Sequence, residues 1–97
     1  MKVWPEVVKT IEKELNAKGK GLWDRLELEI QDGYKSLLVN VYISDDVDEK
    51  LYKKIKELMN ETVDPKVPKL KDDYPWVCVI RNEIEVLGSV LPELENP

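Results

Sequence analysis

The sequence contains no histidine and only one cysteine. Without histidine the chain cannot form a Ser-His-Asp triad or a Cys-His pair, and with one cysteine a zinc site is not expected. The lone thiol, Cys78, lies in the apolar run WVCVI, so we interpret it as a buried, unreactive side chain. The sequence therefore marks no nucleophile, predicts no cofactor, and favours a protein that is not an enzyme.

Long hydrophobic runs are also missing from the chain. No segment approaches the ~20 apolar residues of a membrane span, and no charged leader followed by an apolar segment is recognisable. A single cysteine agrees with a reducing compartment, so we expect a cytoplasmic protein that does not contact a membrane. The 97 residues, of which 42% are hydrophobic and 36% charged, predict a single folded domain over 1–97.

Positive charge is in deficit, and the deficit narrows the choice of partner. The chain has 15 basic and 20 acidic residues, and every charged residue from Glu83 onward is acidic. A field of this sign repels polyphosphate and attracts cationic surfaces, so nucleic acid is disfavoured and a basic protein is the expected partner. The glycine-containing stretch 18–21, KGKG, follows a predicted helix, which favours a helix stop and a turn over a phosphate-binding loop.

Apolar periodicity predicts most of the secondary structure. The predicted elements are a helix over about 5–18, a hairpin over about 22–43, a helix over about 47–61, a proline-rich loop over about 63–75, a strand over about 76–81, a strand over about 84–88 and an acidic tail over about 92–97. This order, α-β-β-α-β-β, predicts an α+β two-layer sandwich with two helices packed on one face of a small, mostly antiparallel sheet.

The two segments that follow residue 75 need separate arguments. The continuous apolar run at 76–80 is typical of a strand inside a sheet and covered on both faces. In the last segment, Ile84 and Val86 alternate with glutamates as in a strand, but Ile84, Leu87 and Leu91 also fit a helical spacing. We favour a hairpin through Asn82 and Glu83 into a fourth strand.

The hairpin register follows from its expected turn. An Asp-Gly pair at 32–33 is a strong signal for a two-residue loop. The pairs that such a loop predicts are Gln31 with Tyr34, Leu28 with Leu37, Leu26 with Val39, and Trp23 with Tyr42. The same register sets Asp24 opposite Val41 on the inner face, where a carboxylate fits poorly.

The stretch 43–50, ISDDVDEK, is the most acidic in the chain and has two interpretations. Asp45, Asp46 and Asp48 could bind a metal ion in a hydrolase, but the stretch lacks the glycine and the twelfth-position glutamate of an EF-hand loop. We favour Asp46 as the N-cap of the second helix, with Glu49 three residues later. Asp45 and Asp48 then remain as an acidic surface, and no metal site is predicted.

Two surfaces are candidates for binding a partner. The first is the sheet face that the helices leave open, with aromatic side chains among polar ones, as in interface hot spots. Its residues are Trp23, Arg25, Glu27, Glu29, Leu38 and Tyr42. The alternative is that these aromatics only stabilise the hairpin or lie under the C-terminal segment. The second surface is Asp72, Asp73 and Tyr74, which is either a charged anchor or an ordinary turn.

Small size, acidity and the absence of histidine lead to one principal hypothesis. The chain is expected to be a non-enzymatic protein-binding domain, most concretely an immunity protein or inhibitor that neutralises a basic partner such as a nuclease toxin. One alternative is a homodimer or assembly subunit that uses the same sheet face. The other is a carboxylate-dependent, metal-assisted hydrolase.

Overall fold

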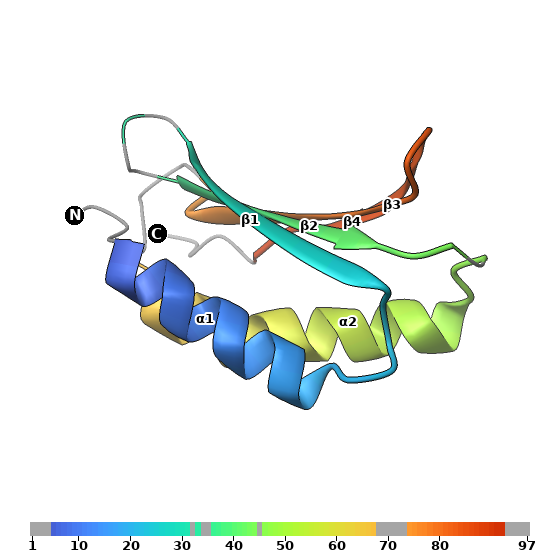
Figure 1. Cartoon of the computed structure of the whole chain (residues 1–97), viewed down its shortest axis with the longest axis horizontal. Helices are drawn as coiled ribbons and strands as arrows, with labels where there is room; N and C mark the ends of the chain where they lie inside the picture. The colour runs from blue at the N-terminus through green and yellow to red at the C-terminus, as the bar shows by residue number, and fades with distance from the viewer. Residues whose placement is uncertain (1–4, 32, 34–35, 45, 68–73, 93–97) are drawn as a thin grey trace, which may run out of the picture.

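Two helices cover one face of a four-stranded sheet (Figure 1). The computed structural model describes residues 5–31, 33, 36–44, 46–67 and 74–92. The elements along the chain are α1 (Pro5–Lys18), β1 (Arg25–Gln31), β2 (Ser36–Tyr42), α2 (Glu49–Thr62), the short 3-10 helix η1 (Asp64–Lys66), β3 (Trp76–Arg81) and β4 (Val86–Val90). The predicted α-β-β-α-β-β sandwich is confirmed.

The four strands lie in the order β1-β2-β3-β4. The pairs β1–β2 and β3–β4 are antiparallel, whereas β2 and β3 are parallel and are connected through α2. A parallel pair needs such a crossover because its strands start at the same edge of the sheet. The third strand therefore lies inside the sheet, as its apolar composition predicts.

The core lies between the sheet and the helices. Alternate residues of β2 and β3 point towards the helices and are fully buried. The buried side chains of the two layers include Leu37, Val39, Val41, Trp76, Cys78, Ile80 and Val90 from the sheet and Ile11, Leu15, Ile55 and Met59 from the helices. This alternation is what leaves the other face of β2 and β3 available for other contacts.

The predicted hairpin register is wrong by two residues. Gln31 pairs with Ser36 and Leu28 with Val39, so four residues connect the strands instead of two. A shift of two residues keeps every side chain on its own face, because side chains in a strand alternate with a period of two. The hydrophobic pattern is therefore equally compatible with both registers, and only the length of the connection separates them.

The corrected register also removes the misfit at Asp24. Leu26, not Asp24, lies opposite Val41, and Asp24 precedes the first residue of β1. Its exposed carboxylate accepts a hydrogen bond from the Ser44 backbone N–H at 2.9 Å. Asp24 thus ties the start of β1 to the chain that leaves β2.

The start of α2 differs from the prediction. Asp48, not Asp46, is the N-cap, and its side chain accepts a hydrogen bond from the Leu51 N–H at 2.7 Å. The helix begins at Glu49, two residues later than predicted, so the aspartate three residues before Leu51 is the one in reach of a free N–H group. The acid interpreted as surplus surface charge is therefore the structural one.

We expect Asp48→Ala to lower the free energy of unfolding by about 1 kcal/mol, because it removes the side-chain acceptor at the first turn of α2. Asp46→Ala is the matched control: it removes the same charge two residues earlier and should change stability by less than about 0.5 kcal/mol. Urea denaturation followed by circular dichroism measures both. If Asp46→Ala lost more stability than Asp48→Ala, the N-cap of α2 would be Asp46, as the sequence predicts.

The C-terminal segment is a strand and not a helix. β4 pairs with β3 through Cys78–Val90 and Val79–Ser89, and a bulge interrupts the pairing next to Ile80 and Arg81. The turn before β4 runs from Asn82 to Glu85 and is longer than the predicted two residues. The Asn82 side-chain oxygen accepts hydrogen bonds from the N–H groups of Ile84 and Glu85, each at 2.8 Å, which moves the strand two residues later. Residues 93–97 of the predicted tail lie outside the described residues.

An ion pair connects η1 to α1. Lys66 Nζ lies 2.8 Å from Glu14 Oε2, and Lys18 Nζ lies 3.9 Å from the same oxygen. The hydrogen bond from Lys66 is the main cause of a pKa of Glu14 below its ordinary value of 4.5. η1 opens the predicted proline-rich loop, of which residues 68–73 lie outside the described part.

Acid should therefore weaken this connection. A carboxylate with a lowered pKa in the folded state contributes stability above the unfolded pKa, and this contribution is lost as the pH falls through the lowered value. We expect Glu14→Gln to be less stable than the native chain at neutral pH, with the difference shrinking as the pH falls below 4.5. Glu12→Gln, an exposed neighbour on α1, is the control, and thermal unfolding at several pH values measures the trend. A difference independent of pH would contradict this role of Glu14.

Candidate protein-binding face of the sheet

The sheet face turned away from the helices is the main candidate site, and we call it the open face. Figure 1 shows both helices on the opposite side of the sheet. The open face is formed by Arg25, Glu27 and Glu29 of β1, Ser36, Leu38, Asn40 and Tyr42 of β2, Val77, Val79 and Arg81 of β3, and Val86 and Ser89 of β4. Its β2 and β3 residues are half-buried, whereas the alternate residues of the same strands are buried.

An apolar centre and an acidic edge characterise this face. Cross-strand pairing aligns Glu29 with Leu38 and Leu38 with Val77, and the next row aligns Glu27, Asn40 and Val79. In these two rows the apolar side chains belong to the central strands, and the glutamates belong to the edge strand β1. An apolar centre bordered by charge is the usual anatomy of a protein-binding surface.

Tyr42 is held between two arginines at one end of the open face. The Arg25 guanidinium carbon lies 3.8 Å from the centre of the Tyr42 ring, and that of Arg81 lies 5.5 Å from it. Arg25 in turn donates a hydrogen bond to Glu83 at 2.6 Å and to Glu27 at 3.3 Å. The bond to Glu83 is the first cause of a raised pKa of Arg25. These contacts restrain the aromatic ring before any partner binds.

Five of the six predicted open-face residues lie together there, and Trp23 does not. Trp23 precedes β1, and Arg25 takes the predicted place opposite Tyr42. The Trp23 ring lies against Gly19 at the end of α1, and its Nε1 is 3.5 Å from Asn16 Oδ1. The two-residue error in register is the reason, because it moved the tryptophan into the sheet.

Sequence reasoning missed the β3 residues of this face, which are Val77, Val79 and Arg81. The run WVCVI was interpreted as covered on both faces, but its burial alternates between buried and half-buried residues. An apolar strand gives the same sequence pattern whether its second face is covered or left open. No signal within the run distinguishes the two cases.

The second predicted surface is only partly described. Tyr74 is 38% exposed, and its carbonyl oxygen accepts a hydrogen bond from the Ser36 hydroxyl at 3.4 Å. Asp72 and Asp73 lie outside the described residues, as does Asp45 of the acidic stretch. Tyr74 thus lies beside the first residue of β2, next to the open face.

Metal binding has no support in the part of the chain that the structure describes, where no group of three acidic, cysteine or histidine residues could hold an ion. Asp48, one of the three acids of the hydrolase alternative, is engaged as the N-cap of α2. No observation favours that alternative, and we do not propose it.

The single thiol is on the other side of the sheet. Cys78 is fully buried on the helix-facing side of β3, and burial raises the pKa of its thiol to about 12. A thiol with so high a pKa is protonated at neutral pH and is a poor nucleophile. Its position agrees with the interpretation of an unreactive core residue.

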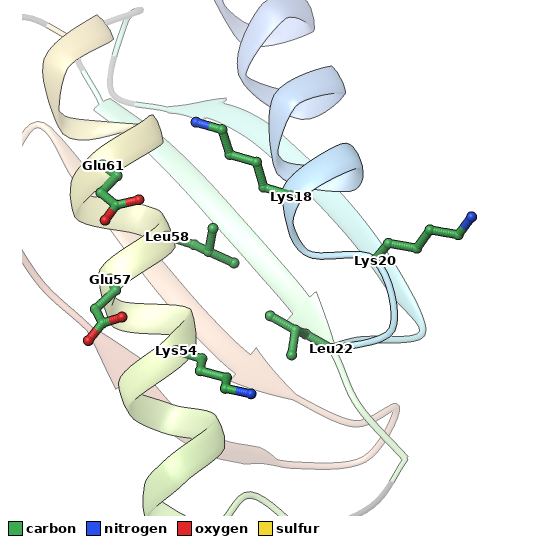
Figure 2. Close-up of a pocket in the computed structure, with 7 residues that line it drawn as sticks. All are labelled: Lys18, Lys20, Leu22, Lys54, Glu57, Leu58 and Glu61. Atoms are coloured by element: carbon green, nitrogen blue, oxygen red, sulfur yellow. The ribbon is translucent and has the colours of Figure 1, made fainter.

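A groove of about 310 Å³ between α1 and α2 is a further concave surface (Figure 2). Its floor is formed by Leu22 and Leu58, which point towards each other across the groove. Its other lining residues are Lys18, Lys20, Lys54, Glu57 and Glu61. Because both lysines and glutamates line the groove, it has no strong field of one sign that would attract a phosphate or nucleic acid.

The helical layer is close to neutral in charge. α1 and α2 together carry seven lysines and six glutamates, although the whole chain has 15 basic and 20 acidic residues. The acidic excess therefore belongs to residues outside the two helices. Glu27 and Glu29 of the open face are among these acids, and the same face also carries Arg25 and Arg81.

Comparisons with known proteins identify no relative of this chain. No protein-family model matches the chain, and no curated protein or solved structure is significantly similar to it. Within the described ranges, neither helix is long and apolar enough to cross a membrane.

Proposed function

We propose that this chain is a non-enzymatic protein-binding domain that engages a basic protein through the open face. The observation that carries the proposal is the apolar centre of Leu38, Val77 and Val79 beside the acidic edge of Glu27 and Glu29. In its most concrete form the domain is a cytoplasmic immunity protein or inhibitor that neutralises a basic partner such as a nuclease toxin.

The two parts of the open face have different roles in this proposal. Glutamates at an exposed edge raise the rate at which a cationic partner arrives, and this effect weakens with salt. The apolar centre and Tyr42 then supply affinity, since buried aromatic anchors dominate the energy of most interfaces. Because Arg25 and Arg81 already restrain the Tyr42 ring, little side-chain entropy is lost on binding.

Isothermal titration and stopped-flow kinetics with a basic protein encoded beside this chain test the proposal. We expect Tyr42→Ala to weaken binding at least about 30-fold, the value for a hot-spot residue. Glu27→Lys with Glu29→Lys should slow association and reduce its dependence on salt. Lys13→Ala on the outer face of α1 is the control and should bind normally.

Two results would contradict the proposal. Binding that survives both open-face variants unchanged would place the contact elsewhere on the molecule. Binding that does not weaken with salt would remove the reason for choosing a basic partner.

A further inference from the structure

The exposed apolar side chains of the described residues are concentrated at one edge of the sheet. Five large apolar residues are exposed, and four of them lie in the segment from Ile84 to Leu91. Their exposed fractions are 91% for Ile84, 59% for Val86, 36% for Leu87 and 44% for Leu91. Clustering of this kind marks an interaction surface, whereas scattered exposed apolar residues need no explanation.

The strand at this edge is open to pairing. β4 pairs with β3 on one side, and no described strand pairs with it on the other. An edge strand presents backbone N–H and C=O groups that a further strand can bind. The other edge strand, β1, carries Arg25, Glu27 and Glu29, and charged side chains discourage such pairing. β4 has no charged residue from Val86 to Val90, so it is the edge that is better suited to accept a strand.

We propose that an extended segment of a basic partner, apolar in its middle and with lysines or arginines at its ends, pairs with β4 as a fifth strand. This inference rests on the proposed function and names how the basic partner is recognised. In strand addition the main-chain hydrogen bonds supply affinity, and alternate side chains supply specificity.

Charge selects this occupant. The uncharged stretch 86–91 lies in a part of the chain where every charged residue, from Glu83 onward, is a glutamate. Glu83 is paired with Arg25 at 2.6 Å, whereas Glu85 is exposed and has no ion pair among the described residues. A second copy would bring acids against acids at this edge, whereas the basic ends of a partner strand are attracted to them.

The arginine that pairs with β4 directs its charge away from the free edge. Arg81 of β3 lies opposite Val86. Its guanidinium carbon is 5.5 Å from the centre of the ring of Tyr42, which belongs to β2, on the other side of β3 from β4. The positive charge of Arg81 therefore lies towards the middle of the sheet and leaves the β4 edge free for a basic segment.

Tyr52 of α2 holds the edge strand in place. Its hydroxyl donates a hydrogen bond to the Ser89 carbonyl at 2.9 Å. Because a carbonyl oxygen has two lone pairs, Ser89 can accept this bond and one from an added strand. The charged residues three or four positions from Tyr52, which are its neighbours on the helix surface, are Asp48, Glu49 and Lys56. With two acids and one base, this side of the edge has no positive field that would repel a basic segment.

An added strand would adjoin the open face. Val86 and Ser89 of β4 belong to that face, where they lie beside Arg81 and Val79 of β3. A partner that places one segment on the β4 edge therefore brings its neighbouring residues to the open face. Two linked contacts on one partner bind more tightly than either contact alone.

NMR titration of the isotope-labelled full chain with synthetic peptides tests the inference. The probe is the capped peptide KKVTVTVKK, which has strand-forming residues in its middle and lysines at its ends. We expect saturable binding with a Kd below about 1 mM and the largest amide shifts in β4. The same peptide with glutamates in place of the lysines should bind at least about tenfold more weakly. So should KKVTVTVKK with N-methylated central amides, because those amides cannot donate hydrogen bonds to β4.

Variants of the chain locate the contact. Val86→Lys and Leu91→Lys should each weaken peptide binding at least about tenfold, because each replaces an apolar contact with a charge of the same sign as the peptide. Gln31→Lys adds the same charge at the β1 edge and should leave binding unchanged. The side chains of Val86 and Leu91 are exposed, and circular dichroism verifies that the variants fold.

Three results would overturn strand addition. The first is a peptide that does not saturate at millimolar concentration, and the second is an N-methylated peptide that binds as tightly as the parent. The third is a dimer of the chain in sedimentation that Val86→Lys dissociates, because a second copy would then occupy the edge.

These failures are distinct from a failure of the proposed function. Tyr42 lies on β2, two strands from the edge, so Tyr42→Ala should weaken binding of a basic protein but not of the peptide. Loss of peptide binding while a basic protein still depends on Tyr42 would remove strand addition alone. Peptide binding at β4 with a basic protein that is indifferent to Tyr42→Ala would instead remove the open face as the principal contact.

Discussion

Trp76→Ala is expected to lower the free energy of unfolding by about 3–5 kcal/mol. Trp76 is the largest fully buried side chain among the described residues and is the first residue of β3, next to Leu37 of β2. Its indole Nε1 donates a hydrogen bond to Asp64 Oδ1 at 2.9 Å, which connects β3 to η1. The substitution leaves a large cavity and removes this bond, so two contributions to stability are lost together.

The loss is large relative to the stability of a domain of this size. Domains typically unfold at a cost of about 5–15 kcal/mol, so the variant would retain little stability at physiological temperature. Urea denaturation followed by circular dichroism gives the free energy. Trp76→Phe helps to separate the two contributions, because it removes the N–H group but leaves a much smaller cavity than alanine does.

Val79→Ala is the matched control on the same strand. Val79 is half-buried on the open face, and its substitution should cost about 1 kcal/mol. If Trp76→Ala were no more costly than Val79→Ala, the core would not lie on the side of the sheet that the structure assigns. Alkylation of the Cys78 thiol is a second measurement of unfolding. Because Cys78 is buried, a reagent should reach it only when the core opens.

The elements that sequence could predict are those with one dominant signal. Ile11 and Leu15 have the helical spacing of a buried stripe, and α1 has the predicted bounds. The apolar run at 76–81 is bounded by Pro75 and Asn82, and β3 also has the predicted bounds. In both cases burial and local preference indicate the same structure, so no further information was needed.

The features that failed depend on choices between near-equal alternatives. Asp46 and Asp48 are both good N-cap residues, and only the first turn of α2 decides between them. The hairpin register could shift by two residues without exposing any core side chain. The prediction of a two-residue loop depends on one local signal, the Asp-Gly pair at 32–33, whereas four residues connect the two strands.

Of the six residues predicted for the open face, the error in register misplaced only Trp23. The predicted face retained Leu38 and Tyr42, which a shift of two residues leaves on the same side. Trp23 was lost from it, because the chain before β1 turns back towards α1. Val77 and Val79 were gained, because they enter the face only through the parallel pairing of β2 with β3, which is a tertiary feature.

The contact between Gly19 and Trp23 leads to a prediction in which two effects have opposite signs. Gly19 has no left-handed backbone conformation, and alanine near a helix is favoured over glycine by up to about 1 kcal/mol. A methyl group at this position would overlap the six-membered ring of Trp23. Overpacking of this kind costs about 1–3 kcal/mol, so we expect Gly19→Ala to destabilise the fold.

The aromatic ring must move for the variant to fold. Trp23 is half-buried and packs against the core, and its Nε1 is held only by a long contact of 3.5 Å to Asn16. The ring can therefore swing towards solvent, which relieves the overlap but loses its apolar contacts. A red shift of tryptophan fluorescence should accompany the loss of stability.

A double-mutant cycle separates the steric effect from helix preference. In a Trp23→Ala background the overlap is absent, so Gly19→Ala should become neutral or stabilising, and the coupling between the two sites should be about 1–3 kcal/mol. Gly88→Ala is the control, since the described structure places no atom within 4 Å of its added methyl group. A stabilising Gly19→Ala in the native background, or a coupling near zero, would show that Trp23 does not lie on Gly19. In that case the tryptophan would again be available to the open face, where the sequence first suggested it.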